Sequence, residues 1–122
     1  MKDQRLAFFR GALDGLLESL EASVRISRWR GPEPIPEPLQ KAHNQLLDRL
    51  GAANRLAAGK FAGTPVVIAA MTAMSVAIQK LDVAFVEYRR TIAGNPTQQE
   101  EGAIALEAEI EAVKLEAPKW SL

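Results

Sequence analysis

Apolar residues recur at intervals of three and four along most of the chain, the spacing that places them on one face of an α-helix. The pattern predicts four helices, over residues 3–29, 38–61, 65–93 and 97–117, and no strand. We therefore expect an all-α fold, an antiparallel four-helix bundle, in one domain over residues 1–117 with a tail over 118–122. The apolar stripe of the first helix is the clearest: Leu6, Phe9, Leu13, Leu16, Leu17, Leu20 and Val24.

Prolines and capping residues mark the connections between these helices. The segment GPEPIPEP, residues 31–38, has proline at every second position, which cannot continue a helix and favours an extended chain. It predicts a long connection between the first two helices. Thr64 and Pro65 predict the start of the third helix, as N-cap and first helical residue. Thr97 and Glu100 have the spacing of a capping box that would open the fourth.

The third helix begins with PVVIAAMTAMSVAI, residues 65–78, an apolar run that only Thr72 and Ser75 interrupt. This run would rise about 21 Å as a helix, less than the roughly 30 Å of a bilayer core, and polar residues follow at once. We therefore expect no membrane span. Two interpretations remain: the helix is the most buried of four in its own chain, or its second apolar face meets another chain. That second face carries Ile68, Val76, Val83 and Val86.

Self-association through this helix is the function that the pattern favours, with a homodimer as the expected assembly. Methionine side chains adapt readily to irregular partner surfaces, and small residues permit close helix approach. The candidate interface residues are Val67, Met71, Met74, Val76, Ile78, Val83 and Phe85. The corresponding prediction is a non-enzymatic interaction or scaffold module.

Composition narrows the chemistry further. The chain has 122 residues, 48% of them apolar, with 15 basic and 15 acidic residues, one histidine and no cysteine. Cysteine-based zinc sites, thiol nucleophiles and disulfides are excluded, and one histidine does not provide the ligands of a di-iron bundle site. Balanced charge gives no general reason to expect nucleic acid. We expect no enzyme activity, no cofactor and a cytoplasmic location, because the interrupted N-terminal apolar segment is unlike a signal peptide.

The charges are nevertheless uneven along the sequence. Residues 39–63 contain four basic side chains and one aspartate, whereas residues 95–122 contain six glutamates and two lysines. This asymmetry predicts that the acidic fourth helix docks beside the basic second helix, within one chain or between chains.

His43 supplies an alternative function. Residues 42–56, AHNQLLDRLGAANRL, resemble the helix that displays the active histidine in histidine phosphotransfer domains, which are helical bundles of similar length. The resemblance implies a signalling module with His43 as the phospho-acceptor. This chain lacks the basic residue and the glycine that shortly follow the histidine in that family.

A third possibility is a small nucleic-acid-binding protein. The segment VRISRWRG brings Arg25, Arg28, Trp29 and Arg30 together, and arginine beside an aromatic ring can hold phosphate and stack on a base. The competing interpretation is that the arginines complement the C-terminal dipole of the first helix while Trp29 caps the end of the bundle. Trp29-Arg30-Gly31 also resembles the Trp-x-Gly turn of small secreted helical hairpins.

Overall fold

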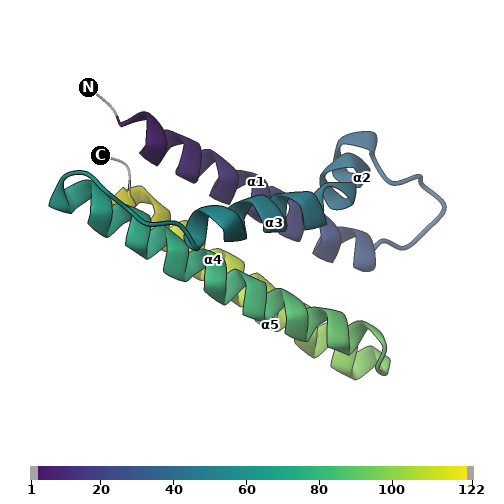
Figure 1. Ribbon diagram of the computed structural model, residues 1–122. Helices are drawn as coiled ribbons and strands as arrows, with labels where there is room; N and C mark the ends of the chain where they lie inside the picture. The colour runs from purple at the N-terminus through teal and green to yellow at the C-terminus, as the bar shows by residue number, and fades with distance from the viewer. Residues whose placement is uncertain (1–2, 121–122) are drawn as a thin grey trace.

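The computed structural model describes residues 3–120, which form five α-helices and one 3-10 turn (Figure 1). The elements are α1 (Gln4–Ser27), α2 (Glu37–Asn44), α3 (Leu46–Ala57), α4 (Pro65–Ile92), α5 (Pro96–Glu116) and the 3-10 turn η1 (Ala117–Trp120). Residues 3–120 contain no strand, so the predicted all-α class is confirmed. Residues 28–36, which include three prolines, connect α1 to α2 without forming a helix.

The prediction of one continuous helix over residues 38–61 is wrong. The helix is interrupted at Gln45, whose backbone (φ −89°, ψ −1°) departs from helical geometry, and Figure 1 shows α2 and α3 pointing in different directions. Different neighbours account for the break, since α2 packs on α1 whereas α3 packs on both α1 and α4. The helix also ends early, at Ala57, because the following loop turns back and places the Phe61 ring edge-on to Phe9, with 5.7 Å between centroids.

Local side-chain hydrogen bonds fix the starts of α4 and α5. The hydroxyl of Thr64 accepts a hydrogen bond from the Val67 amide, as expected for the N-cap of α4. The capping box of α5 lies two residues before the predicted position: Asn95 accepts from the Gln98 amide, and the Gln98 side chain accepts from the Asn95 amide. Pro96 explains the shift, because proline is favoured at the first helical position.

The core forms where α1, α4 and α5 lie together. Helices α4 and α5 pack side by side along their length, and α1 contacts all four other helices (Figure 1). The predicted apolar stripe of α1 is buried in full. The most deeply buried large side chains come from these three helices: Leu13, Leu16, Leu20, Met74, Ile78, Leu81 and Leu106.

The acidic helix α5 docks beside α1, and it makes no contact with the basic helix α3, so that prediction is wrong for this chain. The Arg28 guanidinium binds Glu100 at 2.7 Å and Glu107 at 2.6 Å. Lys114 of α5 pairs with Glu21 of α1, and this pairing raises the pKa of the Lys114 ammonium group. The charge asymmetry could not reveal this arrangement, because α1 itself supplies the partners of both signs.

The segment predicted as a tail, residues 118–122, starts within the 3-10 turn η1. Trp120 is buried against the core, and the Arg10 guanidinium donates a hydrogen bond to the Ala117 carbonyl at 2.9 Å. Residues 121 and 122 of the predicted tail lie outside the described part of the chain, as do residues 1 and 2.

Candidate functional site

The solvent side of α4 carries three branched apolar side chains in one row. Val76, Val83 and Val86 are 44%, 65% and 51% exposed. Steps of seven and three residues keep them on one side of the helix over about 15 Å. These three residues are named the α4 valine stripe below. Apolar side chains standing in such a row are a typical feature of surfaces that meet a partner.

Only two of the seven candidate interface residues belong to this surface. Met71, Met74, Ile78 and Phe85 are buried in the core of their own chain and are therefore unavailable to a partner, which corrects their assignment as anchors. Val67 is half-buried and packs against the same core. Val76 and Val83 remain. These four core side chains are buried because α1, α3 and α5 all cover this face of α4.

A shallow groove of about 540 Å³ extends the apolar surface from α4 towards α5. Val76 and Lys80 line one side of it, and Ala112 and Leu115 line the other, with Trp120 at the end. Leu115 is largely exposed. Lys80 and Glu109 both border the groove, and within residues 3–120 neither belongs to an ion pair.

Helix α4 also meets the length and composition expected of a membrane-crossing helix, with a mean hydropathy of 1.6 in its most apolar window. It is the one helix within residues 3–120 that does so. Core helices of soluble proteins satisfy the same test, and one face of α4 is occupied by the core of the chain.

His43 lies at the end of α2, where its imidazole contacts α1. The Nδ1 atom is 2.8 Å from the Ser23 hydroxyl, and that hydroxyl donates its proton to the Ser19 carbonyl at 2.9 Å. In the tautomer that carries its proton on Nδ1, Ser23 accepts from Nδ1–H and the lone pair lies on Nε2. A cavity of about 480 Å³ adjoins this pair and is lined by Leu47 and Tyr88 among others.

The basic cluster at the end of α1 is largely engaged within the chain. Arg28 binds two glutamates of α5, which raises the pKa of its guanidinium and gives it counter-charges within the chain. Arg30 donates to the Ser27 and Trp29 carbonyls, and the Trp29 indole donates to the Glu33 carbonyl. Arg25 is exposed beside Glu107 and Glu111. Of the four residues, Arg30 is the one whose side chain donates to a carbonyl at the end of α1, that of Ser27.

Within the described residues, histidine and carboxylate side chains form no group of three or more that could hold a metal ion. Comparisons of the chain with protein-family models, with curated proteins and with solved structures gave no match. The features of the chain that bear on its function are therefore the α4 valine stripe, His43 and the cavities.

Proposed function

We propose that this protein is a non-enzymatic, cytoplasmic interaction module that forms a homodimer through the α4 valine stripe. Its framework would be an antiparallel four-helix bundle, in which α2 and α3 together occupy the position of one helix. The proline-containing connection would link that pair to α1.

The observation that carries the proposal is the exposure of three valines in one row on a helix whose opposite face is covered by α1, α3 and α5. Burying a valine side chain contributes roughly 1.5–3 kcal/mol when it moves fully out of water, and a two-fold interface would bury the stripe of each copy. Gln79, between Val76 and Val83, is neutral, and the two charged residues beside Val86 on this side of the helix, Glu87 and Arg90, pair with each other at 3.0 Å.

Charge at the groove supports a second copy as the partner. Lys80 and Glu109 border the groove without an ion pair in their own chain. In a two-fold arrangement, the same surface of two copies meets itself, so a lysine of one copy can pair with a glutamate of the other. A surface with both signs of charge at its edge is in this way complementary to itself.

Light scattering across a concentration series tests the dimer. Val83→Glu should give a folded monomer, because an exposed position tolerates a carboxylate in the monomer and a buried interface does not. The matched control is Val66→Glu. Val66 is exposed on the same helix, roughly 80–100° around its axis from Val76 and Val83, and its substitution should leave the dimer intact. A monomeric wild type, or a Val83→Glu dimer of unchanged affinity, would contradict the proposal.

The second candidate function is phosphotransfer through His43, and one observation favours it. Nδ1 contacts Ser23, and Nε2 has no hydrogen-bond partner within residues 3–120. In the tautomer with its proton on Nδ1, the Nε2 lone pair would attack the phosphorus of a phosphoryl donor and release the donor's leaving group. Incubation with a small phosphoryl donor should give an acid-labile phosphate detectable by ³¹P NMR. His43→Gln should abolish this signal, and a signal that persists in His43→Gln would exclude His43 as the acceptor.

A further inference from the structure

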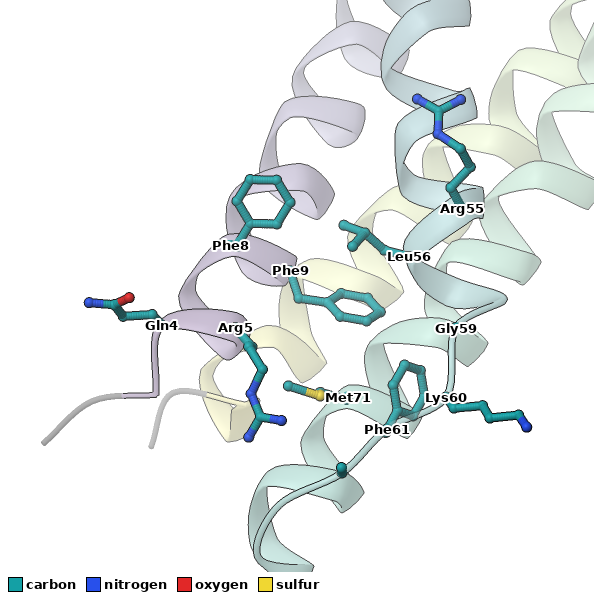
Figure 2. A pocket seen from close by; sticks show the side chains of 11 residues that line it. Gln4, Arg5, Phe8, Phe9, Arg55, Leu56, Gly59, Lys60, Phe61 and Met71 are labelled. Atoms are coloured by element: carbon teal, nitrogen blue, oxygen red, sulfur yellow. The ribbon is translucent and has the colours of Figure 1, made fainter.

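A cavity of about 400 Å³ lies at the opposite end of α4 from Val83 and Val86, where the first turns of α1 meet the end of α3 and the loop that follows it (Figure 2). Its apolar wall is formed by Phe8, Phe9, Leu56, Phe61 and Met71. Figure 2 shows Phe9, Leu56 and Phe61 in the middle of the site and the longer polar side chains around them. The volume is within the range of pockets that hold small molecules.

The aromatic wall is partly fixed and partly open. Phe9 is buried and meets Phe61 edge-on, so both rings are held in place by the fold. Phe8, the next residue on α1, is 70% exposed although it borders the same cavity. The Phe8 ring, beside the fixed Phe9–Phe61 pair, therefore leaves part of the apolar cavity wall in contact with water, where a bound ligand would cover it.

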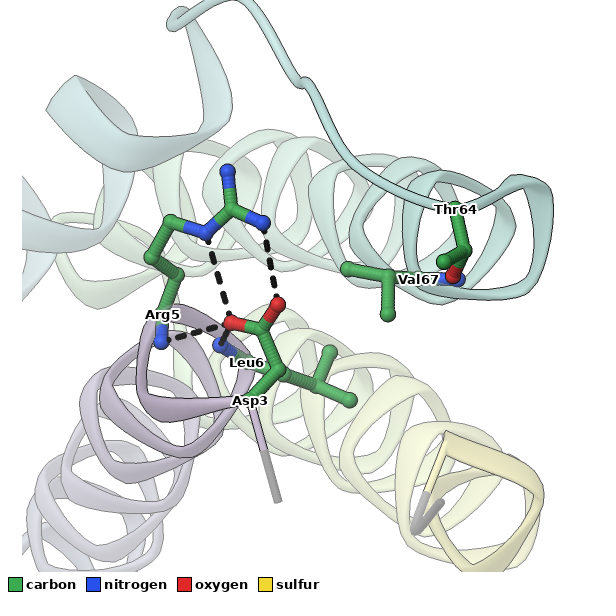
Figure 3. A network of polar contacts seen from close by, with 5 residues as sticks. All are labelled: Asp3, Arg5, Leu6, Thr64 and Val67. Atoms are coloured by element: carbon green, nitrogen blue, oxygen red, sulfur yellow. Dashed lines mark hydrogen bonds and ion pairs between the residues drawn. The ribbon is translucent and has the colours of Figure 1, made fainter. Parts of the chain in front are cut away.

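The charges around this wall are of one sign. Arg5, Arg55 and Lys60 line the cavity, and no aspartate or glutamate does. Arg5 is balanced by Asp3, which accepts from its guanidinium at 2.9 and 3.3 Å and also caps α1 (Figure 3). Within residues 3–120, Arg55 and Lys60 belong to no ion pair. Two positive charges next to an apolar wall therefore lack a counter-charge.

The loop supplies further hydrogen-bond donors. The backbone N–H groups of Lys60, Phe61 and Ala62 donate to no acceptor within the described residues. Backbone N–H groups that the fold leaves unpaired are satisfied by water or by a ligand. Donors and cations without acceptors are the groups to which a carboxylate binds.

We propose that this cavity binds a small amphipathic carboxylate, with its apolar body against the phenylalanines and its anionic end at Arg55, Lys60 and the loop. A cationic ligand would meet only positive charge here, and a neutral one would leave that charge unmatched. The site is separate from the α4 valine stripe, so it adds a ligand to the proposed module without depending on dimerisation.

Octanoate is a suitable probe because its chain is apolar and its charge is a single carboxylate. Titration into ¹⁵N-labelled protein should give saturable NMR shifts at Gly59, Phe61 and Phe8, with weaker binding of octanol and of octylammonium. Arg55→Gln combined with Lys60→Gln should weaken octanoate about fivefold, the effect expected from losing exposed charge interactions, and should change octanol affinity little. Phe8→Ser should weaken both ligands.

The matched control combines Arg25→Gln with Arg89→Gln, which removes the same total charge away from this cavity and should leave octanoate affinity unchanged. Equal binding of octylammonium would refute an anion site. Shifts centred on His43 would place the ligand in the other cavity and overturn the proposal. So would binding to anionic vesicles without saturable octanoate binding, because the surface would then be a lipid contact.

Discussion

Ser75 is the position where a single substitution is expected to stabilise the protein. It lies in α4, it is 5% exposed, and its Oγ is the one buried side-chain polar atom within residues 3–120 that has no hydrogen-bond partner. A buried hydroxyl without a partner costs roughly 1–3 kcal/mol of desolvation. Alanine removes this cost and has a better helix propensity by about 0.5 kcal/mol, against the loss of a few contacts of one oxygen atom. Ser75→Ala should therefore raise the free energy of unfolding by about 1–2 kcal/mol.

Ser23→Ala is the matched control, since Ser23 is also helical and 5% exposed. Its hydroxyl donates to the Ser19 carbonyl and also hydrogen-bonds to His43 Nδ1, so its removal leaves that ring nitrogen unpaired. This substitution should lower stability by about 1 kcal/mol. Urea unfolding and thermal melts at one fixed protein concentration measure both, with roughly 3–6 °C expected per kcal/mol. A Ser75→Ala variant no more stable than wild type would refute the reasoning, because it would mean that the Ser75 hydroxyl is satisfied.

Three other perturbations follow from the packing and the charges. Gly102→Ala should destabilise the protein by about 2 kcal/mol or more, because a Cβ at this position would lie 2.1 Å from the Thr91 hydroxyl. Gly11→Ala should stabilise it by about 0.5–1 kcal/mol, because a Cβ there would meet no atom within 4 Å. Urea midpoints that changed in the same direction would contradict this contrast. Arg28→Gln should lower the free energy of unfolding by about 1 kcal/mol or less, and this loss should shrink in 1 M NaCl because salt screens exposed ion pairs. A loss of stability that does not depend on salt would mean that Arg28 acts through packing. The hydrogen bond from the Arg5 side chain lowers the pKa of Asp3 below its ordinary 3.8. The contribution of Asp3 to folding stability is therefore complete above pH 3.8 and is lost as the pH falls towards the pKa of Asp3 in the folded state. Asp3→Asn should accordingly reduce the fall in urea midpoint between pH 6 and pH 3, and an unchanged fall would assign the acid sensitivity to other groups.

The helices themselves were predictable from the sequence where the periodicity is long and the caps are strong. The stripe of α1 and the start of α4 at Thr64 and Pro65 depend on local spacing and local hydrogen bonds, which a single sequence contains. The break at Gln45 was not predictable, because no proline or glycine marks it. It occurs where α2 and α3 part to contact different neighbours. Nor could the pattern reveal that Phe61 leaves the helix to pack on Phe9.

The candidate interface was only partly predictable for a related reason. A helical wheel gives the direction in which Met71, Met74 and Val83 point, but it does not say how many helices cover α4. Because α1, α3 and α5 all cover α4, the buried side of this helix includes both methionines, and the valines lie outside it. The charged cavity was missed altogether, because its walls come from α1, from the end of α3 and the loop after it, and from α4, which only the fold brings together.

The hydrogen bond from Arg10 to the Ala117 carbonyl joins residues 107 positions apart and ties the start of α1 to the end of α5. During synthesis α1 leaves the ribosome before α5. At roughly 5–20 residues per second, several seconds pass before α5 can cover its part of α1. The α4–α5 hairpin needs only a short turn and can form as soon as both helices have emerged. The leucine stripe of α1 therefore stays partly open to solvent until α5 has been made, although α1 is made well before it.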